Sequence, residues 1–198
     1  MKKLFTLLVF FIPLSLFSQL ANTSYLIPSV GISIPANNDS YKSSFNAGIA
    51  FEFAMTKMTA FGIETNIANV ISKNNSDVFP EVMGYTYYGT GNYTAIGFSA
   101  YGKIQSVDAM KSPWQPFAKI GLGTSLIGQS VHYTTLNDII TKMPYNTSTG
   151  IMLSASAGTN IMINGKNKIV LEAQFRVNKS DTDDIRMVLL NIGYAFRM

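Results

Sequence analysis

The chain has 198 residues, of which 47% are hydrophobic and only 13% are charged. A soluble domain carries about 25% charged residues, so this composition argues against an ordinary cytosolic globule and against a disordered chain. The absence of cysteine and the single histidine, His132, exclude disulfides and cysteine-ligated metal sites. The formal net charge is +4 and there is no basic run, so we expect no nucleic-acid partner, no cofactor and no metal.

The first 18 residues have the layout of a secretory signal peptide. A basic segment at residues 1–3 precedes an apolar stretch at residues 4–17, and polarity rises after Ser18 and Gln19. The apolar stretch is too short for a spanning helix. We therefore predict cleavage near Ser18 and one mature domain at residues 19–198, with a membrane anchor as the alternative.

Bulky apolar residues then alternate with small or polar ones, which is the pattern of β-strands that separate two media. Between residues 45 and 56, for example, Phe45, Phe51 and Phe53 share one face and Glu52 lies on the other. Eight strands are predicted in this way, at residues 24–34, 45–56, 60–71, 93–105, 116–128, 150–163, 168–178 and 186–197. Each approaches or exceeds the roughly 9–11 residues that a tilted strand needs to cross a bilayer.

The predicted connections alternate in length. Residues 56–58 and 164–166 form tight links, whereas residues 35–44, 73–92 and 129–148 form long ones. Short turns at one side and long loops at the other are typical of outer-membrane barrels. The sequence therefore predicts an all-β fold, an eight-stranded antiparallel up-and-down transmembrane β-barrel, with both ends of the mature chain on the periplasmic side.

Composition predicts which face meets lipid. The polar face is mostly Gly, Ala, Ser and Asn, which suits a narrow lumen that side chains fill. The bulky face has no mid-strand charge, as expected where a charge costs about 2–4 kcal/mol. Three acids and three bases on the polar face should pair inside the lumen: Glu52, Glu64, Lys103, Lys119, Glu172 and Arg176. The alternative is a soluble periplasmic, lipocalin-like β-barrel that binds an apolar ligand.

Three segments, PFAKIGLG at residues 116–123, LEAQFR at 171–176 and NIGYAF at 191–196, resemble strands of the small outer-membrane β-barrel domain family, which includes OmpA/OmpX-type and PorT-like proteins. The last strand is similar to that family's assembly signal, at Asn191, Gly193, Phe196 and Met198, although the family more often ends in an aromatic residue. The resemblance implies a Gram-negative cell outer membrane, surrounding outer-membrane lipid, and the barrel-assembly machinery as a partner during biogenesis. It implies no single biochemical activity.

We expect a monomer without an open channel and without enzymatic activity, which has a structural or surface-binding role. A ligand or partner would meet the external loops, at residues 35–44, 73–92 and 129–148. The tyrosine- and glycine-rich residues 84–93 either form part of such a binding loop or extend the two flanking strands above the membrane. The alternative is a lipid-modifying acyl hydrolase. Ser130 and His132 fall on one face of a strand end, with Asp138 further along the loop, and a serine, a histidine and a carboxylate can support acyl hydrolysis.

Overall fold

The computed structural model describes residues 23–36, 41–72, 77–82, 85–106, 112–134, 140–142, 146–163, 166–180 and 184–198. The predicted signal peptide lies outside these residues and remains a prediction. Among the described residues, no helix is both long enough and apolar enough to cross a membrane.

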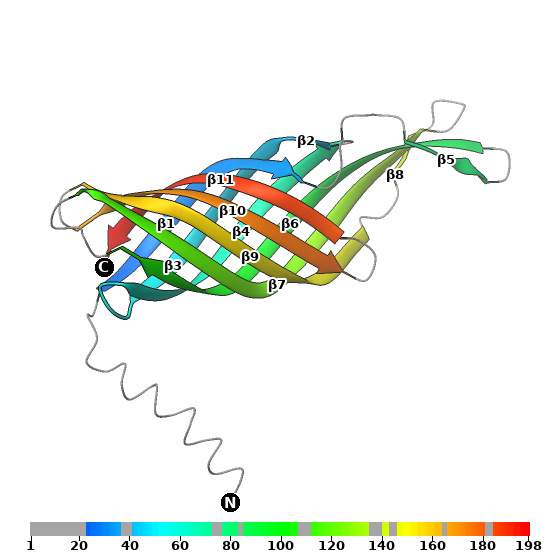
Figure 1. Ribbon diagram of the computed structural model, residues 1–198. Coiled ribbons are helices and arrows are strands. Elements are labelled where there is room, and N and C mark those ends of the chain that lie inside the picture. The colour runs from blue at the N-terminus through cyan, green and yellow to red at the C-terminus, as the bar shows by residue number, and fades with distance from the viewer. Residues whose placement is uncertain are drawn as a thin grey trace, which may run out of the picture.

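The described residues form eleven strands. Their bounds are β1 Thr23–Pro35, β2 Tyr41–Lys42, β3 Ser44–Ala54, β4 Thr59–Ser72, β5 Asp77–Val82, β6 Tyr85–Gln105, β7 Trp114–Thr134, β8 Ile140–Lys142, β9 Asn146–Met162, β10 Lys168–Ser180 and β11 Asp184–Arg197. Eight of them, all but β2, β5 and β8, form the wall of a barrel in which each strand is antiparallel to the next. The barrel is closed because β1 pairs with both β3 and β11 (Figure 1). The predicted eight-stranded antiparallel barrel is therefore confirmed.

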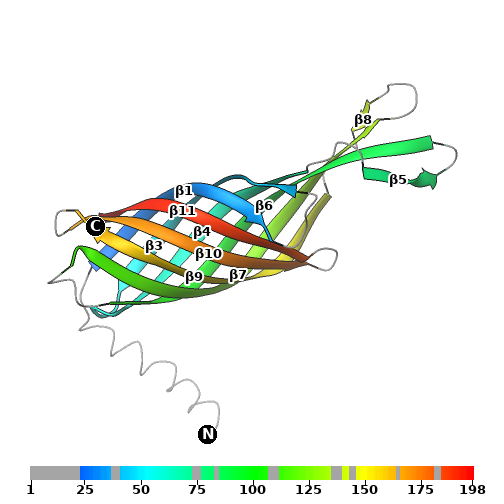
Figure 2. The same cartoon turned by 45° about the horizontal axis from the view of Figure 1, so that its top comes forward.

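All three predicted long loops are wrong in part, because they contain strands. Strand β2 lies within residues 35–44 and pairs with β4, and the other two loops contain longer segments. Strands β6 and β7 have 21 residues each and stay paired beyond the barrel, as far as Tyr88 opposite Thr134. Strand β5 pairs with β6, and β8 pairs with β7. Continued pairing gives the backbone N–H and C=O groups of these segments partners within the chain. We call β5, residues 85–92 of β6, residues 130–134 of β7 and β8 the ribbon, which projects from one end of the barrel (Figures 1 and 2).

The two ends of the barrel differ. The end with the ribbon is the loop end, and the opposite end, with the tight connections, is the turn end. At the turn end, the Thr56 hydroxyl accepts hydrogen bonds from the N–H groups of Met58 and Thr59, both at 3.0 Å, which fixes the β3–β4 turn. The Met198 N–H donates to the Ser24 carbonyl at 3.0 Å, so the start of β1 and the end of β11 both lie at this end.

The two faces of the wall carry the side chains that the alternation predicted. The outward face exposes large apolar residues, among which Ile120 is 72% and Leu122 is 61% exposed. Glu52, between the outward residues Phe51 and Phe53, is buried in the lumen. The predicted face assignment is thus confirmed, and the barrel has its bulky apolar surface outside and its polar groups inside.

Small residues in the lumen make room for large ones across the strand pairs. Phe117 lies opposite Gly158, and Tyr101 lies opposite Gly62. A Cβ atom on Gly158 would lie 2.6 Å from the Phe117 ring, and one on Gly62 would lie 2.4 Å from the Tyr101 hydroxyl. Glycine is needed at these two positions because the aromatic rings occupy the space that any larger side chain would take.

Candidate functional site

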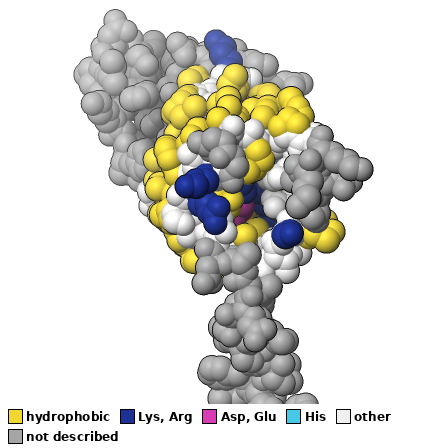
Figure 3. All heavy atoms as spheres, turned by 90° about the vertical axis from the view of Figure 1, so that its left-hand side faces the viewer, with side chains coloured by type: hydrophobic (Ala, Val, Ile, Leu, Met, Phe, Trp, Pro, Cys, Tyr) yellow, Lys and Arg dark blue, Asp and Glu magenta, His cyan; other side chains and the backbone are white. Residues whose placement is uncertain are grey.

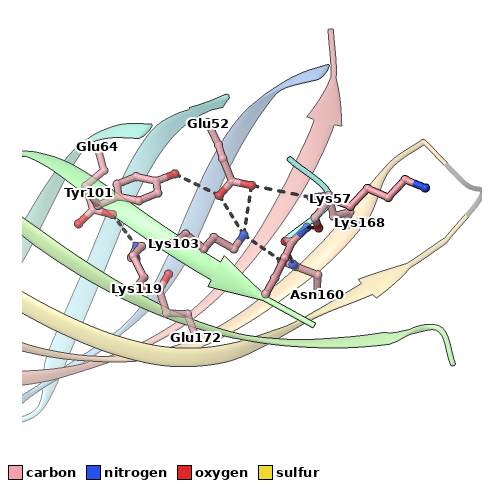
Figure 4. Close-up of polar contacts among 10 residues, drawn as sticks. Glu52, Lys57, Glu64, Tyr101, Lys103, Lys119, Asn160, Lys168 and Glu172 are labelled. Atoms are coloured by element: carbon pink, nitrogen blue, oxygen red, sulfur yellow. Dashed lines mark hydrogen bonds and ion pairs between the residues drawn. The ribbon is translucent and has the colours of Figure 1, made fainter. Parts of the chain in front are cut away.

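The turn-side cluster consists of Glu52 on β3, Lys103 on β6 and Lys168 on β10 (Figure 4). Lys103 Nζ donates to Glu52 Oε1 at 3.1 Å and to Oε2 at 2.9 Å. Lys168 Nζ lies 3.8 Å from Glu52 Oε1, and the Tyr101 hydroxyl donates to Oε2 at 3.3 Å. The three charged side chains are 3–5% exposed. One buried carboxylate therefore serves two buried ammonium groups, and this cluster has a surplus of one positive charge.

Both lysines of the turn-side cluster also make cation–π contacts with aromatic rings. Lys168 Nζ lies 3.7 Å from the centroid of the Tyr25 ring, and Lys103 Nζ lies 4.4 Å from that of Phe117. The electron-rich face of an aromatic ring attracts a cation, by about 2 kcal/mol when both are desolvated. Lys103 also donates to Asn160 Oδ1 at 3.4 Å. These contacts hold both lysine side chains across the lumen near the turn end.

The central cluster lies further along the lumen, around Lys119 of β7. Its Nζ lies 2.8 Å from Glu64 Oε2 on β4 and 2.6 Å from Glu172 Oε1 on β10. Gln174 Nε2 donates to Glu64 Oε1 at 2.9 Å. The Arg176 guanidinium donates to Gln174 Oε1 at 2.9 Å, and also to the side-chain oxygen of Asn66. Two bases and two acids make this cluster neutral. Its ion pairs and amide hydrogen bonds cross the middle of the lumen and connect β4, β7 and β10.

The structure places all six predicted network residues in the lumen and divides them between the two clusters. Sequence reasoning missed Lys168, which is also buried there. The expected balance of three acids and three bases is therefore wrong, because the described lumen holds four bases. Lys168 is the first residue of β10 and also of the strand predicted at residues 168–178, so a count restricted to charges in the middle of strands left it out. Its position could have identified it, because Lys168 is an even number of residues from Glu172, Gln174 and Arg176 and so lies on the same face of the strand.

A small polar cavity of about 40 Å³ lies among the clusters. Lining atoms Asn46 Nδ2 and Asn191 Oδ1 have no hydrogen-bond partner within the described part of the chain. Since one water molecule needs about 10–15 Å³ of such volume, the cavity has the size and the polar groups to hold a few waters. Side chains from β3, β4, β6, β7, β10 and β11 line this cavity.

The other predicted site residues lie elsewhere. Ser130 and His132 belong to the part of β7 in the ribbon, where their backbones pair with Asn92 and Thr90 of β6. Asp138, the third member of the predicted acyl hydrolase site, lies outside the described residues, so this site remains an alternative prediction.

The residues of the predicted assembly signal lie at the C-terminal strand. Asn191, Gly193 and Phe196 belong to β11, and Met198 follows it. Asn191 and Gly193 are on the lumen face, whereas Phe196 is exposed on the outer face. Recognition of this strand by the assembly machinery remains a prediction.

No protein-family model matches the sequence, and no curated protein matches it. Among solved structures, the chain is similar to neisserial surface protein A, with 13% identity, a TM-score of 0.53, and coverage of 90% of this chain and 98% of that one. It is also similar to Ail, the attachment invasion locus protein of Yersinia pestis, with 13% identity, a TM-score of 0.50, and coverage of 90% and 100%. A structure of Ail with the heparin analogue sucrose octasulfate matches at 12% identity, with a TM-score of 0.50 and coverage of 90% and 100%. At these identities the likeness shows a shared fold, the small eight-stranded barrel of outer-membrane proteins.

Proposed function

We propose that the chain is a monomeric integral protein of the cell outer membrane, with a closed lumen, and that it displays the ribbon at the cell surface for binding. The observation that carries the proposal is the outward face of the barrel. Soluble monomers rarely expose contiguous apolar patches larger than a few hundred Å². Here exposed large apolar side chains come from every wall strand: Val30, Phe53, Ile63, Phe98, Leu122, Leu153, Phe175 and Ile192.

The distribution of charge on that face supports insertion in a bilayer. Among outward side chains that the structure describes on the eight wall strands, charges occur only at the loop end, on Lys179 of β10 and on Asp184 and Arg186 of β11. A charge facing lipid at the middle of the membrane costs about 2–4 kcal/mol, whereas one near the interface costs little. The charge-free band is what a hydrocarbon environment requires. A soluble lipocalin-like barrel would place its polar face outward, which is the reverse of this arrangement.

The lumen supports a structural rather than a channel role. The ion pairs from Glu52 to Lys103 and from Lys119 to Glu172 each join two strands that have one other strand between them. The hydrogen bond from Gln174 of β10 to Glu64 of β4 joins strands on opposite sides of the barrel. An eight-stranded barrel has an interior just wide enough for side chains to fill. The buried pairs therefore brace the wall from inside, which supports a closed lumen.

The ribbon supports a binding role at the surface. Strands β6 and β7 run from the barrel into the ribbon without interruption, so a rigid scaffold positions the projecting part. In the described part of the chain, β5 pairs only with β6, and β8 pairs only with β7. Each therefore has an edge of backbone groups that an extended segment of a partner can pair with.

Cell fractionation tests insertion. We expect the full chain to stay with outer membranes through carbonate and high-salt washes and to need detergent for release. In detergent, the folded barrel should migrate differently on a gel before and after boiling. Release by carbonate alone would reject the spanning barrel in favour of the soluble alternative.

Site-specific proteolysis tests display of the ribbon. A protease recognition site placed in the connection at residues 135–139 should be cut when the protease is added to intact cells. The matched control carries the same site at residues 107–111, a connection at the turn end, and should be cut only after the cells are opened. Cleavage of the control on intact cells would reverse the orientation and contradict surface display of the ribbon.

The acyl hydrolase alternative rests on Ser130, His132 and Asp138. His132→Ala should leave lipid A acylation in the expressing cells unchanged. Loss of a lipid A deacylation that the unmodified chain produces would instead favour the enzyme.

A further inference from the structure

The turn end of the barrel has an exposed rim of positive charge. Lys57 lies in the β3–β4 turn, Lys166 lies in the β9–β10 connection and Arg197 ends β11, and all three are exposed. In the space-filling view of this end, Lys and Arg side chains lie on two sides of the mouth of the barrel (Figure 3). Among the described residues of this end, no Asp or Glu side chain is exposed. The exposed charged side chains described at this end therefore carry a single sign of charge.

The buried charge behind the rim has the same sign. The turn-side cluster contains Lys103 and Lys168 against one carboxylate, Glu52, and all three are nearly excluded from solvent. The low-dielectric wall of the barrel focuses the electric field of the surplus buried cation towards the open mouth. This surplus is independent of the exposed rim and raises the positive potential at the same place.

The rim lies where the apolar band ends. Trp114, which begins β7 and is 54% exposed, points outward at the turn end, opposite Ile161. The Met162 N–H donates to the Pro113 carbonyl at 3.0 Å, which ties this position to the β9–β10 connection that carries Lys166. Tryptophan at the edge of an apolar band is typical of the membrane interface. The basic side chains therefore lie at the level of lipid headgroups.

We propose that the turn-end rim binds anionic phospholipid headgroups, with Lys57 and Arg197 as principal contacts, Lys166 beside them, and the surplus charge of the turn-side cluster strengthening the attraction. This inference rests on the proposed membrane insertion. Basic residues next to a membrane surface attract anionic lipid by charge. The ligand class is thus a lipid with a net negative phosphate headgroup, in the leaflet that faces the turn end.

The chain provides its own probe for this proposal, because Trp114 is its only tryptophan. The folded chain is reconstituted in vesicles of phosphatidylcholine and phosphatidylglycerol in which one lipid at a time carries bromine on its acyl chains. Bromine quenches tryptophan at short range, so Trp114 fluorescence reports which lipid lies beside the turn end. We expect brominated phosphatidylglycerol to quench more than brominated phosphatidylcholine at the same mole fraction. The relative association should differ by roughly twofold to fivefold, since one basic residue near an anionic surface changes association by about fivefold.

Two variants with equal net charge locate the effect. K57Q/R197Q should abolish the preference for phosphatidylglycerol, whereas K42Q/K179Q, which removes two exposed lysines at the loop end, should retain it. In 1 M NaCl, where the Debye length is about 3 Å, the unmodified chain should also lose it. Gel mobility before and after boiling checks that both variants are folded.

The outcomes separate this inference from the one on which it rests. Equal quenching by the two brominated lipids in the unmodified chain, or an equal loss of preference in both variants, would overturn the lipid site and leave membrane insertion intact. An absence of quenching by either lipid would show that Trp114 is not beside acyl chains. That result would overturn the insertion and the lipid site together.

Discussion

Replacement of Glu52 by glutamine tests the charge accounting of the lumen. The carboxylate makes two hydrogen bonds with Lys103, at 3.1 and 2.9 Å, and lies 3.8 Å from Lys168. Glutamine keeps the size and one acceptor oxygen but removes the negative charge from between two buried ammonium groups. Removal of one partner from a buried ion pair costs about 3–5 kcal/mol. We expect a loss of free energy of unfolding at the upper end of this range, because two cations lose their counter-charge.

Replacement of Lys168 by methionine is the contrasting variant. It removes the surplus cation and its repulsion from Lys103, but it also removes the contact with Tyr25, which contributes about 2 kcal/mol when desolvated. The two effects oppose one another, so we expect a change within about 1 kcal/mol. The double variant E52Q/K168M should be more stable than E52Q alone, because only one uncompensated ammonium group remains.

Urea unfolding of the reconstituted barrel measures these differences. Trp114 fluorescence and gel mobility follow the transition, and linear extrapolation gives the free energy of unfolding. The reasoning is refuted if K168M destabilises the barrel as much as E52Q does, or if the double variant is no more stable than E52Q. Either result would mean that Lys168 is a required partner of Glu52 rather than a surplus charge.

Three further predictions concern the wall. Leu122→Arg should cost about 2–4 kcal/mol in the same titration and Leu122→Gln clearly less, whereas equal losses would argue against lipid at this position. Gly158→Ala should prevent or weaken folding, because its Cβ would lie 2.1 Å from a backbone oxygen, while Gly102→Ala, with nothing within 4 Å, should fold normally on the gel. Cysteines introduced at Val30 and Ile192, which are opposite each other in the β1–β11 pair, should form a disulfide in the folded barrel, and failure to do so would contradict the register of closure.

The wall could be predicted from the sequence because the bilayer and the lumen impose opposite demands on alternate residues. In segments such as residues 45–56, apolar residues alternate with small or polar ones. This alternation predicts both the strand and the face that each side chain occupies. The sequence allows the ribbon to be either a binding loop or an extension of the strands, because its strands project beyond the barrel, where apolar alternation is not required. Tyr85 to Asn92 therefore looked like an aromatic, glycine-rich loop, although its backbone continues β6.

The lumen was predicted in composition but not in pairing. Parity places Glu52, Lys103 and Lys119 inside, but it does not say which carboxylate meets which base. Glu52 and Lys103 lie on β3 and β6, which are separated in the wall by β4, so their contact depends on how the strands tilt across the barrel. Lys168 shows a second limit, since a count of charges in the middle of each predicted strand leaves out a buried charge at a strand end.

The uninterrupted course of β6 and β7 has a mechanical consequence. Their antiparallel ladder runs from Tyr88 opposite Thr134 to Gln105 opposite Phe117, so the ribbon and the wall share the same two strands. A pull on the ribbon along the barrel axis is carried by stretched backbone and by many hydrogen bonds loaded side by side, instead of being opened one bond at a time. A force applied by a partner bound to the ribbon would therefore be transmitted directly to the barrel, because no flexible linker lies between the two.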